Sequence, residues 1–228
     1  MAGQDHADEY AACRARVRAL LADCDDRVAA RVVPTCPDWT VRNLCAHLTG
    51  VAAALVARDN PAGDVQVWVD RLVAERAGRS VSTILDEWDD VGPAFEALMR
   101  ARPASFGALT YDAVAHEHDL RGALGRPGDR TSDGVEASVE ILVAMVRRDL
   151  AATGPVPGTI RLRSGARSWV IGRGEPEVGI DASMWELMRL LGSRRSRRQV
   201  LAAGWVGDIE PFLPAIAHLP LPEHDIDE

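Results

Sequence analysis

The most conspicuous gap in this sequence of 228 residues is lysine, because all 26 basic residues are arginine. We attribute this to the codon bias of a GC-rich genome and not to chemistry. Acidic residues outnumber basic ones by 34 to 26, which gives a formal net charge of −8. Because binding to nucleic-acid phosphates needs a basic surface, this charge argues against a nucleic-acid partner.

Long apolar runs and targeting signals are also missing. No hydrophobic stretch approaches the roughly 20 residues that a helix needs to cross a bilayer. A polar segment with Gln4, Asp5, His6 and Asp8 stands where a signal peptide would begin. We therefore expect no membrane partner and a cytoplasmic location.

The cysteines form no C-x-x-C pair, which argues against a structural zinc knuckle. There are four of them, Cys13, Cys24, Cys36 and Cys45. In a reducing cytoplasm we expect free thiols, and small buried residues are the ordinary interpretation. Cys45 precedes His47 by two positions, which would point it to a different side of the same helix.

The composition is that of a globular protein able to bury a core, with 47% hydrophobic and 26% charged residues. The length allows one large or two modest domains. Up to about residue 152 the apolar residues recur at helical spacing. The break at Val33–Thr40 contains two prolines, after which Asp38 or Thr40 can cap the next helix. We expect helices at about 8–28, 40–57, 109–123 and 132–152. A further helix should begin near residue 82 and end at a turn at Arg102-Pro103.

From Gly154-Pro155-Val156-Pro157-Gly158 onward the pattern changes. Alternating residues at 159–163 and 167–171 predict a hairpin, followed by a short strand near 178–180 and helices near 182–192 and 195–203. We therefore expect an α+β protein, with an up-down helical bundle over residues 1–152 and a small α/β domain over 157–228. The basic cluster Arg194–Arg198 is either a solvated helix start or a contact for an anion or substrate carboxylate.

The strongest chemical signal lies in the helix predicted at 109–123. There Asp112, His116 and Asp119 are spaced four and three residues apart, so their side chains share one helix face. His47, on the apolar stripe of another helix, could add a ligand and leave one coordination position of a metal ion open. In the competing interpretation, Asp112 caps a helix, the histidines of this segment are solvated and His47 is a core residue.

The motifs themselves resemble a known family. Residues 35–48, TCPDWTVRNLCAHL, resemble the "CPxWTVRDLxAHL" opening of the mycothiol-dependent maleylpyruvate isomerase-like family, which belongs to the DinB-like metal-binding bundles. Residues 112–120, DAVAHEHDL, are similar to its second motif, an acidic residue followed after three others by "H-x-x-D-L". The segment from Trp185 to Asp208 resembles the small C-terminal α/β domain of that family. The resemblance covers nearly the whole chain.

The resemblance implies a divalent metal, zinc, held by His47, Asp112 and His116. The acidic ligand of the family is usually Glu, so the shorter Asp112 implies a metal closer to its helix or bound more weakly. Asp119 would orient a ligand, whereas His118, two residues from His116, would point away. The implied chemistry is that the metal binds a low-molecular-weight thiol, mycothiol, lowers its pKa and presents a thiolate to an electrophile.

Several functions remain open at this stage. A thiol-dependent enzyme could isomerise a maleylpyruvate-like acid, by addition to a cis double bond, rotation and loss of the thiol, or it could transfer the thiol. The chain could instead be a metal-binding sensor or interaction module without catalysis. A zinc-dependent hydrolase would need a general base, for which Glu117 and Asp119 are candidates. We expect small-molecule partners and a monomer or homodimer.

Overall fold

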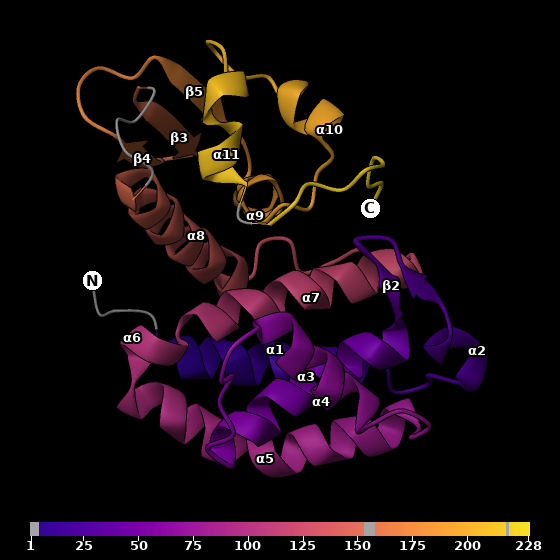
Figure 1. Cartoon of the computed structure of the whole chain (residues 1–228). Helices are drawn as coiled ribbons and strands as arrows, with labels where there is room; N and C mark the ends of the chain where they lie inside the picture. The colour runs from indigo at the N-terminus through magenta and orange to yellow at the C-terminus, as the bar shows by residue number, and fades with distance from the viewer. Residues whose placement is uncertain (1–4, 153–157, 218) are drawn as a thin grey trace. The chain divides into compact units, whose positions relative to one another are not determined.

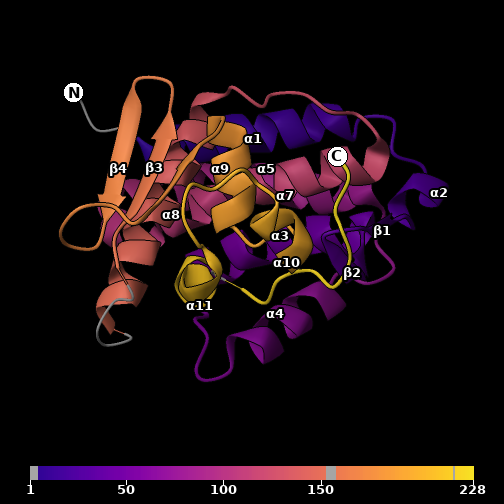
Figure 2. The same cartoon turned by 90° about the horizontal axis from the view of Figure 1, so that it is seen from above.

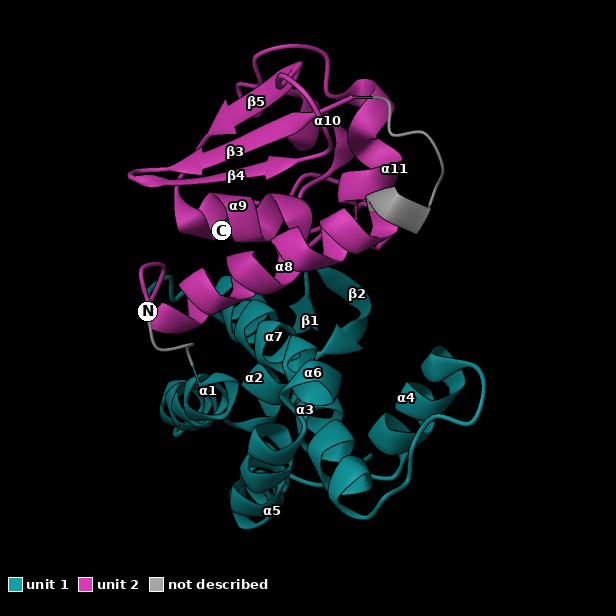
Figure 3. Cartoon of the chain, turned by 90° about the vertical axis from the view of Figure 1, so that its left-hand side faces the viewer, with its two compact units in different colours: residues 1–128, 228 teal, residues 129–227 magenta. Residues whose placement is uncertain are grey.

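The computed structural model describes residues 5–152, 158–217 and 219–228 (Figure 1). Its contacts divide the chain into two compact units, coloured separately in Figure 3. The first unit runs to Gly128 and includes Glu228, and the second covers Asp129–Asp227.

The first unit is a four-helix bundle with short additions. Each of its long helices packs on two others, α1 on α5 and α7, and α3 on the same two, which closes the bundle (Figure 1). Apolar residues from all four helices fill the core, among them Val17, Leu44, Trp88 and Leu120. The long helices are α1 (His6–Leu20), α3 (Val41–Val56), α5 (Val81–Ala101) and α7 (Ala108–Leu124).

Capping residues explain where these helices begin and end. Thr40 accepts a hydrogen bond from the backbone N–H of Asn43 at the start of α3, and the Asn43 side chain accepts one from the backbone N–H of Thr40. This reciprocal pair satisfies two backbone donors at the helix start. Gly125, with φ of 63°, ends α7 in the left-handed conformation that glycine adopts at low cost. Of the two caps that the sequence allows, Asp38 and Thr40, the structure uses Thr40.

The segment between α1 and α3 differs from the prediction. The helix expected over 8–28 ends at Leu20, and Asp25 caps a separate short helix, α2 (Asp26–Ala29). Strands β1 (Val32–Val33) and β2 (Cys36–Thr40) then form an antiparallel hairpin instead of an unstructured break. The prolines of this segment end helical structure but do not prevent a short pairing.

Two short helices of the first unit were not predicted, α4 (Val65–Ala74) and α6 (Pro103–Phe106). Helix α4 packs closely on α3 at Gly50, where an added Cβ would lie only 2.9 Å from the Cβ of Leu72. The close approach therefore depends on glycine at this position.

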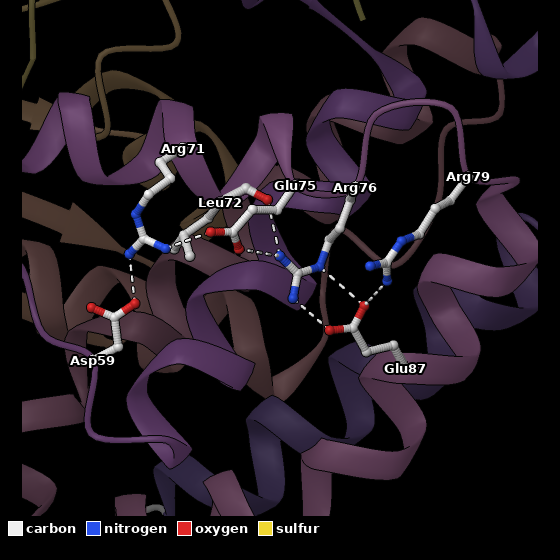
Figure 4. Close-up of polar contacts among 7 residues, drawn as sticks. All are labelled: Asp59, Arg71, Leu72, Glu75, Arg76, Arg79 and Glu87. Atoms are coloured by element: carbon white, nitrogen blue, oxygen red, sulfur yellow. Dashed lines mark hydrogen bonds and ion pairs between the residues drawn. The ribbon is translucent and has the colours of Figure 1, made fainter.

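A group of ion pairs fixes the end of α4 to α5 (Figure 4). The guanidinium of Arg76 is nearly buried, donates to the backbone carbonyl of Leu72 at 2.9 Å and donates to Glu87 on α5 at 2.5 and 3.1 Å. Arg79 donates to the same Glu87 carboxylate at 2.9 Å. Removing Glu87 would leave the nearly buried Arg76 with only the Glu75 carboxylate, at 3.8 Å, which is costly.

The second unit contains a three-stranded sheet with the order β4-β3-β5. Strands β3 and β4 form the antiparallel hairpin visible in Figure 2, and β5 pairs with β3 in parallel. Helix α8 packs on α9, β4 and α11. The elements are α8 (Asp133–Ala152), β3 (Ile160–Ser164), β4 (Arg167–Ile171), β5 (Val178–Asp181), α9 (Met184–Leu191), α10 (Arg197–Leu201), the 3-10 helix η1 (Glu210–Phe212) and α11 (Leu213–Ile216).

The contacts divide the chain earlier than the predicted boundary at residues 152–157. Helix α8, which the sequence predicts as part of the bundle, packs on α9, α11 and β4 of the second unit. Most of the Gly/Pro-rich break at 154–158 lies outside the described residues. The boundary of the family's domains therefore stays a prediction.

The predicted fold class is confirmed, because a helical bundle precedes a smaller unit with mixed strands and helices. Within the described part of the chain, no helix has both the length and the hydropathy that a membrane span requires.

Candidate metal centre

The three predicted ligands meet at the contact between α3 and α7. His47 comes from α3, and Asp112 and His116 come from successive turns of α7. Asp112 Oδ2 lies 3.2 Å from His47 Nε2, and Asp112 Oδ1 lies 3.5 Å from His116 Nε2. One ligand atom from each residue falls within 4.8 Å of the other two. The carboxylate therefore lies between two imidazoles that are far apart in sequence.

These distances fit a divalent metal ion. Two ligand atoms, each about 2.1 Å from a tetrahedral ion, lie about 3.4 Å apart. The carboxylate–imidazole distances of 3.2 and 3.5 Å bracket this value. His47 and His116 are buried, whereas 31% of the Asp112 side chain is exposed. The ligand set therefore has a buried side formed by imidazoles and an accessible side at the carboxylate.

The charged groups of the centre shift one another's pKa values. Burial opposes ionisation of Asp112, but the imidazoles of His47 and His116 outweigh it and hold the pKa of the carboxyl well below its usual value. Burial likewise opposes protonation of His116, but Asp112 and Asp119 raise its pKa well above the usual value. In the absence of metal, a proton on His116 therefore stabilises the cluster and must leave when a metal binds.

Asp119 contacts the far side of His116. Its Oδ2 lies 2.9 Å from His116 Nδ1, and the carboxylate is almost fully buried. An Nδ1–H that donates to a carboxylate fixes the ring and leaves Nε2 free as a ligand. Nε2 is the nitrogen that faces Asp112.

Two residues of the β1–β2 hairpin also lie at the centre, and the helical spacing of the ligands predicts neither of them. The Trp39 ring is 5.0 Å from the His47 ring and 6.2 Å from the His116 ring, measured between centroids. Cys36 forms a second group of possible ligands with His116 and Asp119. Both residues belong to the motif that precedes α3, which was the available signal.

Other candidates lie away from the three ligands. Glu117 is fully buried and accepts hydrogen bonds from Arg16 at 2.8–3.0 Å and from Arg121 at 3.0–3.1 Å, so its carboxylate is committed to two cations. This arrangement does not favour a role for Glu117 as general base. His118 is buried and belongs to neither ligand group of the described residues. Burial raises the pKa of the Cys45 thiol, as expected for a core cysteine.

The basic cluster at 194–198 forms ion pairs within the second unit. Arg195 donates two hydrogen bonds to Glu186, at 2.9 and 3.0 Å. Arg197 pairs with Glu210 and Arg198 pairs with Asp225. These carboxylates balance arginine charges that could otherwise bind an external anion. Arg195 itself is buried, so it does not belong to a solvated helix start.

Comparison with known proteins assigns the chain to a family. The family model described as the mycothiol maleylpyruvate isomerase N-terminal domain matches residues 10–126, which include α3, α7 and the hairpin between α1 and α3. Comparisons with curated proteins and with solved structures gave no match. Because the family model covers more than half of the sequence and contains all three predicted ligands, the chain belongs to the mycothiol maleylpyruvate isomerase N-terminal domain family.

Proposed function

We propose that this protein is a metal-dependent enzyme that uses a low-molecular-weight thiol, mycothiol, to isomerise or thiolate a small electrophile such as a maleylpyruvate-like acid. The observation that carries the proposal is the His47–Asp112–His116 group, whose distances suit one divalent ion, with an accessible side at Asp112. The name of the family supports mycothiol as the thiol.

The chain contributes the ligands and their orientation. His47, Asp112 and His116 would hold the ion, zinc in our proposal, and Asp119 would keep the His116 ring turned toward it. When bound, the ion supplies Lewis-acid chemistry that lowers the pKa of a sulfur ligand. One carboxylate and two neutral imidazoles leave about one net positive charge on a divalent ion, which favours an anionic ligand such as a thiolate.

One aromatic side chain borders the ligand group. Trp39 lies against both imidazoles and would limit access of water on that side. Addition of the thiol is the first step in both isomerisation and thiol transfer. Both reactions therefore place the same demand on His47, Asp112 and His116, and the identity of the electrophile distinguishes them.

Cobalt substitution tests the proposal directly. Sulfur ligands give Co²⁺ intense charge-transfer absorption, so mycothiol should produce a new band in the cobalt protein. His47→Gln and His116→Gln should lose the ion held by the His47–Asp112–His116 group, and Asp112→Ala should lose the thiol-dependent band. His118→Gln is the matched control, because it removes a buried imidazole from the same helix and should keep both metal and band.

Two results would contradict the proposal. One is full metal occupancy in both His47→Gln and His116→Gln. The other is a cobalt protein that keeps its metal but gives no new band with any thiol offered. The second result would favour a metal-binding module or a hydrolase. Turnover of maleylpyruvate, measured with and without mycothiol, would then separate isomerisation from thiol transfer.

A further inference from the structure

A second group of possible metal ligands lies beside the first and shares one residue with it. Cys36 on β2 and His116 and Asp119 on α7 each offer a ligand atom, and these atoms lie within 4.8 Å of one another. The group adds a sulfur donor, which the His47–Asp112–His116 group lacks. It contains neither His47 nor Asp112.

The two ring nitrogens of His116 face different carboxylates. Nε2 lies 3.5 Å from Asp112 Oδ1, and Nδ1 lies 2.9 Å from Asp119 Oδ2. The 2.9 Å contact is the length of an N–H···O hydrogen bond, so an ion at Nδ1 would take the place of its proton. The two ligand atoms would then separate to the roughly 3.4 Å expected for neighbours on a tetrahedral ion, and that ion would be distinct from one bound at Nε2.

Burial and chemistry favour a thiophilic cation on this side. His116 and Asp119 are nearly inaccessible, and Cys36 is half-buried, so an ion could enter from the hairpin side while its ligands stay partly dehydrated. Thiolate combined with imidazole and carboxylate is a donor set that zinc and cadmium accept. Of the four thiols, Cys36 alone belongs to a ligand group among the described residues.

We propose that Cys36, His116 and Asp119 form a second metal position, which binds a thiophilic divalent cation and is bridged to the first position by the His116 ring. Binding forms one metal–sulfur, one metal–nitrogen and one metal–oxygen bond. It releases the thiol proton of Cys36 and the proton held between Nδ1 and Asp119, and nothing is oxidised or reduced. The ion would tie β2 to α7 and so fix Trp39 against the imidazoles.

Cadmium binding to the full chain tests this position without any added thiol cosubstrate. After metal removal by a chelator, equilibrium dialysis against Cd²⁺ should give two ions per chain and an ultraviolet thiolate-to-cadmium absorption band. Cys36→Ser should reduce the stoichiometry to one ion and abolish the band. Cys24→Ser is the matched control, since Cys24 is also half-buried but lies outside both ligand groups, and it should keep two ions and the band.

A third variant separates the two positions. His47→Gln removes a ligand of the first group only, so the chain should bind one Cd²⁺ and keep the thiolate band. The proposal is overturned if the unaltered chain binds a single ion, or if Cys36→Ser keeps both the second ion and the band. Because no cosubstrate is present, a negative result here would not count against the proposed thiol-dependent reaction. Conversely, a cobalt protein that gives no new band with mycothiol would not count against the second metal position.

Discussion

His116 is the residue on which the centre depends, because its ring connects two acidic side chains of the same helix. Asp112 lies one turn before it and Asp119 one turn after it, and the ring nitrogens face them at 3.5 and 2.9 Å. The spacing of four and three residues predicts a shared face. It does not predict that Asp112 faces the Nε2 side of the ring together with His47, whereas Asp119 faces Nδ1. That division follows from the position of His47, which approaches Asp112 alone.

We predict that Asp119→Asn weakens metal binding about 10–100-fold, the usual cost of removing the carboxylate behind a histidine ligand. The amide keeps the size of the side chain but lacks the negative charge that supports the Nδ1–H. Competition with a chromophoric chelator measures the dissociation constant. Asp38→Asn, an exposed site on the neighbouring β2, makes the same charge change and should bind metal normally. Equal affinities in the two variants would contradict the orienting role.

The helices of the bundle carry their own start and stop signals, and for this reason most of them were predictable. Helices α3 and α5 have apolar stripes and side-chain caps, α7 ends at Gly125, and all three lie close to their predicted ranges. Helix α4 escaped prediction although Asp64 caps it, because it is short and rich in β-branched Val, which is typical of strands. The β1–β2 hairpin escaped because strands of two and five residues give almost no alternation.

The difference between regular helices and a short hairpin also explains how much of the site the sequence could predict. The predicted ligands sit on helices, where spacing defines a face, so His47, Asp112 and His116 could be selected in advance and do come together. Cys36 and Trp39 reach the site through the path of a hairpin that packs on α3 and α7. No periodicity encodes that path. The family motif contained both residues without indicating what they do.

At the scale of elements we predict that Thr40→Ala lowers the free energy of unfolding by about 1 kcal/mol, the usual cost of losing a helix cap. The variant removes the acceptor for the N–H of Asn43 at the start of the helix that carries His47. Urea denaturation of the metal-free protein measures the change. Thr40→Ser keeps the hydroxyl and should retain most of the stability. If both variants unfolded at the same urea concentration, the cap would not contribute to stability.

In the whole molecule, the raised pKa of His116 links the effects of pH and of metal binding on stability. The pKa of His116 is raised in the folded metal-free chain, so the stability that its proton contributes is complete below the unfolded pKa of about 6.5. That contribution is lost as pH rises through the folded pKa. A bound metal requires the proton to leave and so gains affinity over the same range.

We therefore predict that metal affinity rises up to about tenfold per pH unit as long as the pH lies below the folded pKa of His116, because one proton is displaced at Nε2. The difference in melting temperature between metal-bound and metal-free protein should widen in the same window. Calorimetry in buffers of different ionisation enthalpy would count the released protons. An affinity independent of pH across this window would show that His116 is not a ligand.

The first ligand group also has a consequence for the order of events in folding. Asp112 and His116 are neighbours on one helix and can meet as soon as α7 forms, within about a microsecond for an isolated helix. His47 is separated from Asp112 by 65 positions, and their contact closes a loop that contains α4, α5 and α6. Closing so long a loop has an entropic cost that only the packing of the bundle can offset. A metal that needs all three ligands would therefore report the docking of α3 on α7, and its spectrum would follow tertiary assembly and not helix formation.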